Sequence, residues 1–290
     1  MPKGQWFFGD NSLDPYRLEA WKTKRVVHSG RSSYQLIEVV DLEKIGLSLF
    51  LDSAIQFSAF DEAHYHELFV HPACSVIKPS TVLILGGGDG GCLREVCRYK
   101  SIKRVILCEI DHEVIDVCKE FFPALSGSFV DSRVELHVQD ALELVKNLDE
   151  KMDLILVDLT DLGELSKALY TAEFMGKLKE LLTENGAVVM QTSGLYYLKS
   201  DPFRLDEFVK SLRGIFKHLA LSYVPIYSFP GGENSFIYLS ENMDFLKINF
   251  VDPPFAESLF FYTPEYAQRT FTLPKVFVSS TDHPSLARII

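Results

Sequence analysis

The chain has 290 residues, enough for one large domain or two unequal ones. Its 29 basic and 40 acidic residues give a net charge of -11, which argues against a general nucleic-acid-binding protein because such proteins carry a basic surface. No apolar run approaches the ~20 residues that span a bilayer, the first residues lack a signal peptide's apolar core, and no two cysteines form a C-x-x-C pair, so we expect a reduced, cytoplasmic protein with no membrane partner.

The N-terminal part of the chain predicts β structure. Residues 32–42 (SSYQLIEVVDL) and 46–60 (GLSLFLDSAIQFSAF) are rich in β-branched and aromatic side chains, with short turns between them. We therefore expect residues 1–75 to form a small N-terminal β domain, with its boundary near residues 70–78.

A helix is predicted over residues 61–73 (DEAHYHELFVHPA). Asp61 is of a residue type that caps helix N-termini, and Tyr65, Leu68 and Phe69 fall on one helical face. Packing into a core is therefore the alternative to a functional role for Tyr65.

The remaining residues, 76–290, alternate strands and helices. Helices are predicted over residues 90–99 and 112–122. Strands are expected over residues 81–88, 104–111, 134–141, 153–161 and 187–194. This alternation predicts an α/β fold, a doubly wound parallel sheet with helices on both faces. Residues 218–229 and 234–240 predict a hairpin at an antiparallel edge.

The glycine-rich turn GGGDGG, residues 86–91, follows the first of these strands and opens a helix. Glycines at this place let the backbone approach a ligand closely, as in nucleotide-binding folds. Asp89 in the middle of the turn would repel a pyrophosphate, so the turn predicts a positively charged ligand rather than NAD. Glu109, at the end of the next strand, is placed to accept the hydroxyls of a ribose.

Carboxylates also end the next two predicted strands. Asp140 ends the third strand, and Asp158 and Asp161 end the fourth. Because open α/β sheets bind ligands at the carboxyl ends of their strands, these acids and the glycine turn together predict a nucleoside site. For any one of these acids, the alternative is a polar strand end that only meets water.

The same segments resemble the spermidine synthase (polyamine aminopropyltransferase) family. The resemblance runs from about residue 21 to residue 277. It rests, in chain order, on SSYQLIEV, LFLDSAIQ, DEAHYHEL, VLILGGGDGGCLREV, CEIDHEVI, VQDA, DLTD and YTPEYAQRTFTLPKVF. It implies a Rossmann-like sheet similar to that of S-adenosylmethionine methyltransferases, with a small N-terminal β domain.

The resemblance implies a site for decarboxylated S-adenosylmethionine, the co-substrate, and for methylthioadenosine, the product. Its residues would be Gln35, Asp89, Glu109, Asp140 and Ala141. Glu109 would hold the ribose, Asp140 and Ala141 would frame the adenine, and Asp89 would hold the ammonium of the aminopropyl chain. Beyond this co-substrate no cofactor and no metal is expected.

The resemblance also implies a polyamine site of Tyr65, His66, Asp89, Asp158 and Asp161. Asp158 would be the general base, and Asp161 would orient the polyamine. The attacking amine must be unprotonated, yet a free alkylamine has a pKa near ~10.4, so a carboxylate that accepts its proton and aligns its lone pair is needed. A Mg²⁺ ion on Asp158 and Asp161 is the disfavoured alternative, because a metal would repel the sulfonium and the ammonium groups.

The histidines of the predicted helix make poor metal ligands. His64 and His66 are two residues apart and so point to different faces, and His71 has no further ligands nearby. Surface or satisfied core positions are predicted for His64 and His71. His66 gains a functional role only from the resemblance.

Three positions depart from the family pattern. Leu162 and Leu165 stand where prolines are usual in a segment that closes over the site, and Phe229 replaces a tyrosine that commonly contacts the acceptor amine. Loss of one hydrogen bond, typically ~1 kcal/mol, predicts weaker putrescine binding or a different acceptor. We expect residues 162–168 to form a mobile lid.

The favoured hypothesis is aminopropyl transfer to putrescine, which gives spermidine and methylthioadenosine. The alternatives are another acceptor (spermidine, cadaverine or agmatine), a methyltransferase, or a non-catalytic polyamine or nucleoside sensor. Asp89 argues against a methyltransferase because it would repel the carboxylate of intact S-adenosylmethionine, and the pair of Asp158 and Asp161 argues against a sensor. The resemblance further implies a homodimer or homotetramer, built partly through the N-terminal strands.

Overall fold

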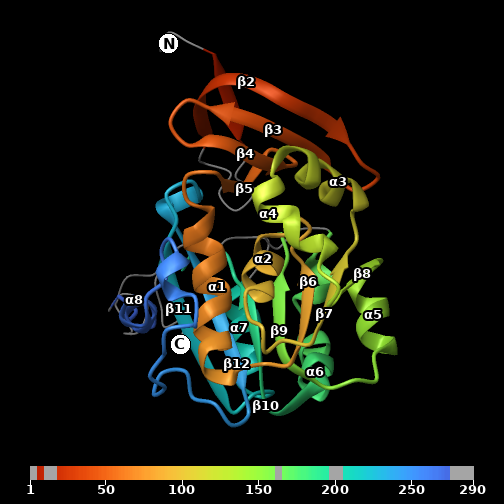
Figure 1. Cartoon of the computed structure of the whole chain (residues 1–290), viewed down its shortest axis with the longest axis vertical. Coiled ribbons are helices and arrows are strands. Elements are labelled where there is room, and N and C mark those ends of the chain that lie inside the picture. The colour runs from red at the N-terminus through yellow and green to blue at the C-terminus, as the bar shows by residue number, and fades with distance from the viewer. Residues whose placement is uncertain (1–4, 10–17, 161–164, 196–204, 275–290) are drawn as a thin grey trace.

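The computed structural model describes residues 5–9, 18–160, 165–195 and 205–274. Two sheets dominate these residues: a small N-terminal sheet at one end of the molecule and a larger sheet covered by helices (Figure 1). None of the helices in the described ranges has the length and apolar character needed to cross a bilayer.

The N-terminal sheet is antiparallel throughout, with its strands in chain order. The strands are β1 (Trp6–Gly9), β2 (Glu19–Arg31), β3 (Leu36–Leu42), β4 (Gly46–Leu51) and β5 (Ala54–Ser58). The predicted β structure of this region is confirmed. The strand β2 has mostly polar, exposed side chains, so its sequence carries no run of apolar residues that would mark it.

The larger sheet has seven strands in the order β11-β12-β10-β9-β6-β7-β8. They are β6 (Thr81–Gly86), β7 (Arg104–Glu109), β8 (Val134–Val138), β9 (Met152–Asp158), β10 (Leu182–Gln191), β11 (His218–Pro225) and β12 (Glu233–Ser240).

Five neighbouring strands of this sheet, β10, β9, β6, β7 and β8, are parallel, and the β11–β12 hairpin adds antiparallel strands at one edge. The chain reverses its direction of winding between β6 and β9, so the predicted doubly wound, Rossmann-like sheet and its hairpin are confirmed.

Helices cover both faces of this sheet. They are α1 (Glu62–Ile77), α2 (Gly91–Cys97), α3 (His112–Phe121), α4 (Pro123–Ser126), α5 (Ala141–Asn147), α6 (Ala172–Leu181), α7 (Leu205–Leu212) and α8 (Pro264–Thr270). Along β6, Leu83 and Leu85 pack into the core formed with α5, α6 and α7. Val82 and Ile84 point the other way, into the core formed with α1, α2 and α8. Burial on both faces explains why the strand reads as a continuous apolar run.

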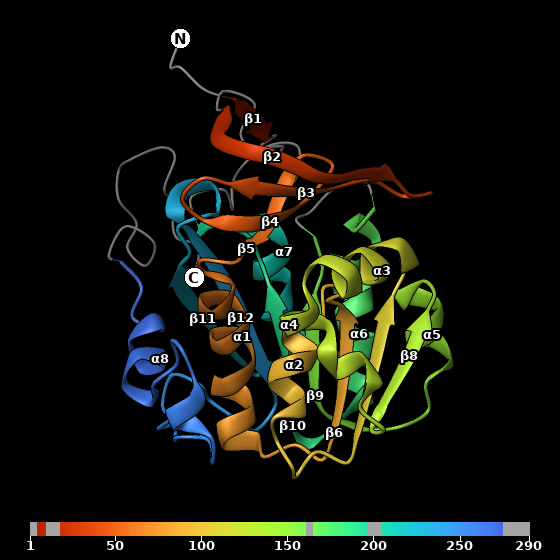
Figure 2. The ribbon, with the colours of Figure 1, turned by 45° about the horizontal axis from the view of Figure 1, so that its top comes forward.

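The N-terminal sheet is attached to the larger domain through α3 and α4. Ile37, Val39 and Leu49 of the small sheet share one buried cluster with Val114 of α3 and Leu125 of α4. Figure 2 shows the small sheet lying across this end of the larger domain. The same packing brings the turn before β3 to the carboxyl ends of the parallel strands.

The helix α1 begins where it is predicted to begin, but its first residue is not capped as expected. Asp61 occupies the N-cap position without a side-chain capping bond. Its carboxylate instead accepts hydrogen bonds from the hydroxyl of Ser58 at 2.6 Å and from the backbone N–H and hydroxyl of Ser228 at 2.8 and 2.9 Å. Asp61 therefore ties the end of β5 to the segment after β11, a contact that helix-capping rules do not anticipate.

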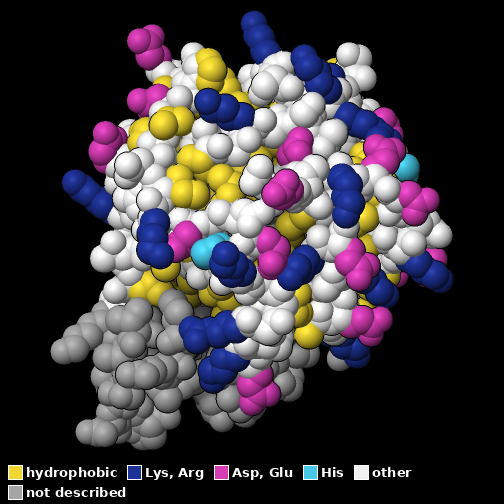
Figure 3. Space-filling model, turned by 90° about the horizontal axis from the view of Figure 1, so that it is seen from below, with side chains coloured by type: hydrophobic (Ala, Val, Ile, Leu, Met, Phe, Trp, Pro, Cys, Tyr) yellow, Lys and Arg dark blue, Asp and Glu magenta, His cyan; other side chains and the backbone are white. Residues whose placement is uncertain are grey.

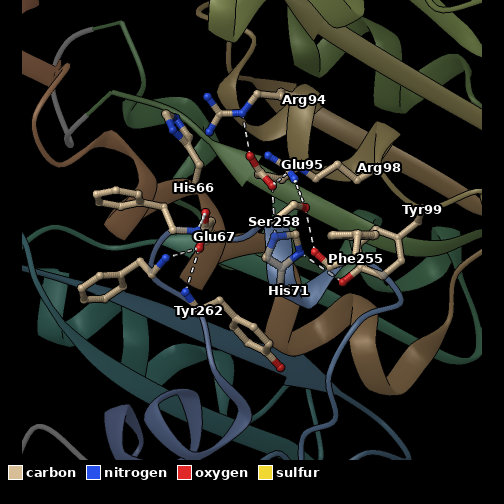
Figure 4. A network of polar contacts seen from close by, with 12 residues as sticks. His66, Glu67, His71, Arg94, Glu95, Arg98, Tyr99, Phe255, Ser258 and Tyr262 are labelled. Atoms are coloured by element: carbon tan, nitrogen blue, oxygen red, sulfur yellow. Dashed lines mark hydrogen bonds and ion pairs between the residues drawn. The ribbon is translucent and has the colours of Figure 1, made fainter.

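A buried carboxylate of α1 also holds the segment before α8. Glu67 accepts hydrogen bonds of 2.7 to 2.8 Å from the backbone N–H groups of Phe260, Phe261 and Tyr262 (Figure 4). The helix α1 packs on α2 and on the strands β9 and β10, so it belongs with the larger sheet.

The face of the molecule opposite the N-terminal sheet carries interspersed acidic and basic side chains (Figure 3).

Candidate active site

One cavity lies at the carboxyl ends of β6, β7 and β9, under the N-terminal sheet. It brings together all of the predicted site residues that the structure describes: Gln35, Tyr65, His66, Asp89, Glu109, Asp140, Ala141 and Asp158. Leu165 and Phe229, two of the three departures from the family pattern, also line it. Asp161 and Leu162 lie outside the described residues, as do residues 163 and 164 of the expected lid.

The glycine turn after β6 forms the floor of this cavity. Gly86 and Gly87 have φ of +83° and +69°, backbone conformations that favour glycine. A Cβ on Gly86 would collide with the backbone carbonyl of Asp158, and a Cβ on Gly88 would lie 2.9 Å from the side chain of Glu109. The N–H of Gly87 donates to the carbonyl oxygen of Asp158 at 2.9 Å. The glycines thus let the ends of β6, β7 and β9 approach one another.

Glu109 is held by the backbone on both of its oxygens. The N–H of Gly88 donates to Oε2 at 3.1 Å, and the N–H of Asp111 donates to Oε1 at 2.9 Å. Burial, with the nearby charge of Asp111, raises the pKa of Glu109 to about 7, although these backbone bonds oppose the shift. The carboxylate is therefore fixed in one orientation at the edge of the cavity.

Asp140 lies at the start of a helix, not at the end of a strand. The strand β8 ends at Val138, and Asp140 is the N-cap of α5. Oδ1 of Asp140 accepts the N–H of Leu142 at 2.8 Å. The strand is predicted to reach Ala141 and ends three residues earlier, because Asp140 belongs to the cap of the helix that follows. Ala141 is buried beside it, and both residues line the cavity.

Gln35 reaches the cavity from the N-terminal sheet. Its Nε2 donates to Oδ2 of Asp111 at 2.9 Å, and the hydroxyl of Ser32 donates to the same oxygen at 2.7 Å. Oδ1 of Asp111 accepts the N–H of Glu113 and so caps α3. One carboxylate thus fixes the turn of the small sheet to the first turn of a helix of the larger domain.

Asp158, the predicted base, is paired with a tyrosine. The hydroxyl of Tyr65 donates to Oδ1 of Asp158 at 2.5 Å. Oδ2 is buried and has no hydrogen-bond partner among the described residues. Burial and the negative charge of Asp89 raise the pKa of Asp158, an effect that His66, the thiol of Cys92 and the hydroxyl of Tyr65 partly offset.

His66 stands between two carboxylates. Its Nδ1 lies 2.7 Å from Oε2 of Glu62, and its Nε2 lies 3.4 Å from Oδ1 of Asp89. Burial opposes the charged ring, but the hydrogen bonds and charges of Asp89 and Glu62 outweigh it and raise the pKa of His66 to about 10. Both ring nitrogens are therefore engaged by protein groups.

The other two histidines occupy the positions predicted for them. His71 is fully buried, with Nε2 at 3.0 Å from Oε2 of Glu95 and Nδ1 at 3.0 Å from the hydroxyl of Tyr99. His64 stacks on the ring of Phe261 at a centroid distance of 3.7 Å. Among the described residues, no group of three or more His, Cys, Asp or Glu side chains is arranged to hold a metal ion.

Two family models match the chain. Residues 62–250 match the spermine/spermidine synthase domain, and residues 5–58 match the spermidine synthase tetramerisation domain. The chain belongs to the spermine/spermidine synthase family. The members of this family with which we compare it are transferases, and this protein is an enzyme of the same class.

Relatives of the family match the chain over nearly its whole length. A polyamine aminopropyltransferase of Saccharolobus solfataricus is 36% identical over 273 residues, which cover 90% of this chain and 88% of the relative. Spermidine synthase 1 of Hyoscyamus niger is 34% identical over 282 residues, which cover 93% of this chain and 88% of the relative. The two matched family models divide the chain between Ser58 and Glu62, where the small sheet ends and α1 begins.

Solved spermidine synthases share the fold. A spermidine synthase in complex with the transition state analogue AdoDATO superimposes with a TM-score of 0.86 at 28% identity, covering 94% of each chain. The spermidine synthase of Thermotoga maritima superimposes with a TM-score of 0.85 at 28% identity, covering 94% of this chain and 93% of that one. The methyltransferase-like sheet with its small N-terminal β domain is therefore confirmed.

The cavity of this synthase-family enzyme has polar lining residues that sequence reasoning missed. Gln191 ends β10, and its Nε2 donates to the carbonyl oxygen of Leu159 at 2.7 Å. Asn234 of β12 and Gln56 of β5 also line the cavity. The rule that identifies Glu109, a polar residue at the carboxyl end of a parallel strand, also selects Gln191. No comparable signal marks Asn234 or Gln56, because their strands are antiparallel.

Proposed function

We propose that this enzyme is a polyamine aminopropyltransferase that moves the aminopropyl group of decarboxylated S-adenosylmethionine to putrescine, giving spermidine and methylthioadenosine. The observation that carries the proposal is the carboxylate of Asp158, which is buried at the switch point of the sheet with one oxygen unpaired among the described residues. A buried, incompletely paired carboxylate is costly, and such groups occur where a ligand or a reaction uses them.

The nucleoside of the co-substrate binds across the ends of β7 and β8. Glu109 is fixed by two backbone N–H groups and accepts the ribose hydroxyls. Asp140, Ala141 and Gln35 also line the cavity: Asp140 and Ala141 frame the adenine, and Gln35 contacts the nucleoside. The glycine turn allows the ligand to lie against the backbone.

Transfer is a displacement at carbon. The acceptor nitrogen attacks the carbon next to the sulfonium, the C–S bond breaks, and the sulfur leaves with its electron pair as the thioether of methylthioadenosine. Asp158 accepts the proton that the nitrogen loses, and Asp89 binds the primary ammonium of the aminopropyl chain. A base whose pKa is raised by burial holds a proton more tightly, which suits the removal of a proton from an alkylamine.

The acceptor lies against one wall of the cavity, to which the neighbouring rings of Tyr65 and Phe229 both contribute. The two rings are 5.9 Å apart, and Tyr65 also stacks on Phe69 at 5.6 Å. An apolar wall suits the methylene chain of a diamine, while Asp158 binds one of its ends. We assign the orientation of the polyamine to Asp161 on the sequence resemblance alone.

Other properties follow from the same proposal. The sulfonium of the co-substrate already carries the activated carbon, so we propose that the reaction uses no resident metal or cofactor. The match to a tetramerisation domain supports oligomerisation, and we propose a homodimer or homotetramer built through the N-terminal sheet. The enzyme would then bind the amine and the co-substrate, and neither nucleic acid nor membrane. We propose that it acts in the cytoplasm.

Product analysis by chromatography tests the reaction. The enzyme is incubated with decarboxylated S-adenosylmethionine and, separately, with putrescine, cadaverine, agmatine or spermidine. We expect methylthioadenosine and spermidine with putrescine, and a loss of at least about a hundredfold in rate for Asp158→Asn, which keeps the shape of the side chain but removes the base. Preference for another amine would change the acceptor, and no transfer to any amine would refute the proposal.

A further inference from the structure

Three charged side chains, Arg94, Glu62 and His66, form a series of contacts that ends at Asp89. Arg94 of α2 donates to both oxygens of Glu62, from Nη1 at 3.0 Å and from Nη2 at 2.8 Å. Glu62 in turn contacts Nδ1 of His66, whose Nε2 reaches Asp89. The four side chains come from α1, α2 and the glycine turn, so the series spans three separate elements of the site.

The far end of this series of contacts is anchored in the core. Nε of Arg94 donates to Oε1 of Glu95 at 2.6 Å. Glu95 is fully buried and also contacts His71 and Arg98, and Arg98 donates to the hydroxyl of Ser258 (Figure 4). Arg94 therefore cannot move without breaking a buried network, and its bidentate grip fixes Glu62.

The imidazole of His66 is also held by packing. A Cβ on Gly91 would collide with the ring, so only glycine lets α2 approach His66 this closely. The side chain of His66 is 2% exposed, and its ring meets that of Phe57 edge-on. Rotation of the ring away from Asp89 would need both neighbours to move.

At Asp89 the two carboxylate oxygens have different surroundings. Oδ1 faces Nε2 of His66 and accepts the backbone N–H of Gly91 at 2.6 Å. Oδ2 makes no hydrogen bond to the described residues, and Asp89 lines the cavity. One oxygen is thus occupied by protein, and the other remains for a ligand.

Among the four acids that line the cavity in the described part of the protein, these charged side chains also make Asp89 chemically different from Asp158. Burial acts to raise the pKa of Asp89, but the hydrogen bond and charge of His66 outweigh it and lower that pKa. At Asp158 burial and the charge of Asp89 raise the pKa, because the charge of His66 and the hydrogen bond from Tyr65 offset them only in part. Two acids whose environments push their pKa values apart take separate roles, one as a permanent anion and one as a base.

We propose that Glu62, His66 and Arg94 are positioning residues for Asp89, which keep it ionised with Oδ1 occupied and Oδ2 available for the primary ammonium of the aminopropyl chain. The proposal rests on the proposed function and deepens it, because it extends recognition of the charged end of the co-substrate to Glu62 and Arg94, which do not line the cavity. Through Asp89, these three side chains favour decarboxylated S-adenosylmethionine over nucleosides that lack this ammonium.

Calorimetric binding of two ligands tests the proposal. Decarboxylated S-adenosylmethionine carries the ammonium, and methylthioadenosine lacks it but shares the nucleoside. For Glu62→Gln we expect the Kd of the first to rise by about tenfold and that of the second to stay within about twofold. In turnover, KM for the co-substrate should rise while KM for the amine stays nearly constant.

His66→Gln and His66→Phe give a second, independent comparison. Gln keeps a donor toward Asp89, so it should retain more of the discrimination than Phe does, at similar thermal stability. Glu173→Gln is the matched control: Glu173 is an exposed acid on α6 that pairs with Lys177, and its loss should change neither Kd.

The outcomes separate this proposal from the one on which it rests. If the wild-type enzyme binds both ligands but Glu62→Gln weakens them equally or not at all, the role of the positioning residues is refuted and the reaction stands. If the wild-type enzyme binds neither ligand, both proposals fail together.

Discussion

The hydroxyl of Tyr65 and Oδ1 of Asp158 lie 2.5 Å apart, although 93 residues of chain separate them. The tyrosine comes from the face of α1 and the aspartate from the end of β9. Its ring stacks on Phe69 and meets Phe236 edge-on at 5.1 Å, so the hydroxyl is delivered by a rigid aromatic cluster. Core packing and a role in the site are therefore not alternatives for this residue: the ring packs and the hydroxyl holds the carboxylate.

Removal of this hydroxyl is expected to lower activity without unfolding the protein. Tyr65→Phe keeps the ring and its packing but deprives Asp158 of a hydrogen bond worth about 1.5–3 kcal/mol for a charged acceptor. Because that bond lowers the pKa of Asp158, its loss should raise the pKa further. We expect kcat to fall by about tenfold and the acidic limb of the kcat–pH profile to move to higher pH.

Tyr238→Phe is the matched control for that variant. Tyr238 is a buried tyrosine whose hydroxyl donates to the carbonyl oxygen of Leu68 at 3.0 Å, and it does not line the cavity. Its loss should lower the unfolding temperature and leave the pH profile unchanged. An unshifted acidic limb in Tyr65→Phe would mean that the hydroxyl does not influence the ionisation of Asp158.

The pKa of Glu109, about 7, predicts that nucleoside binding depends on pH. In the proposed function the carboxylate of Glu109 accepts the ribose hydroxyls. A protonated acid accepts hydrogen bonds less well, so we expect the ligand to bind the deprotonated form. Affinity for methylthioadenosine should therefore rise as the pH increases toward 7, by up to tenfold per unit, and level off above about pH 8. In the free protein the sign is opposite for stability: a raised pKa favours the folded state at low pH, and that contribution is lost as the pH rises through 7.

Calorimetry at several pH values between 5.5 and 8.5 would measure this dependence. Glu109→Gln cannot ionise, so its Kd for methylthioadenosine should be weaker and nearly independent of pH over the same range. A wild-type affinity that stays constant from pH 5.5 to 8.5 would exclude Glu109 as the group that titrates.

The alternation of strands and helices could be predicted because the periodicity is local. The parallel strands are buried on both faces and appear as apolar runs, and Glu109 and Asp158 sit where those runs end. That each of these acids lies at the ligand edge then follows from one rule about open sheets. The place of Glu109 and Asp158 in one cavity could be predicted from the sequence for this reason.

The links between side chains could not be predicted in the same way. Glu62 and His66 are four residues apart on α1, a spacing that allows a contact. The spacing does not show that the other ring nitrogen of His66 faces Asp89, which lies on another element. Asp61 shows the opposite case: its capping signal is local, and tertiary partners on Ser58 and Ser228 override it. In both cases the deciding partner lies on another element.

The contact between Asp111 and Gln35 yields a prediction about how the two sheets cooperate. Asp111→Asn keeps an oxygen that can cap α3, but places an amide NH₂ opposite Nε2 of Gln35 and the hydroxyl of Ser32. We expect the free energy of unfolding to fall by about 2 kcal/mol, because buried donors lose a charged acceptor. The Kd for methylthioadenosine should also rise several-fold, since Gln35 is no longer held against the cavity.

Thermal unfolding and calorimetry on the same preparation would measure both effects. The control is Asp116→Asn: Asp116 is exposed on the same helix and pairs with His112, so its substitution should change neither stability nor affinity. A loss of stability with unchanged affinity would show that Gln35 keeps its place, or is not needed there, without this anchor.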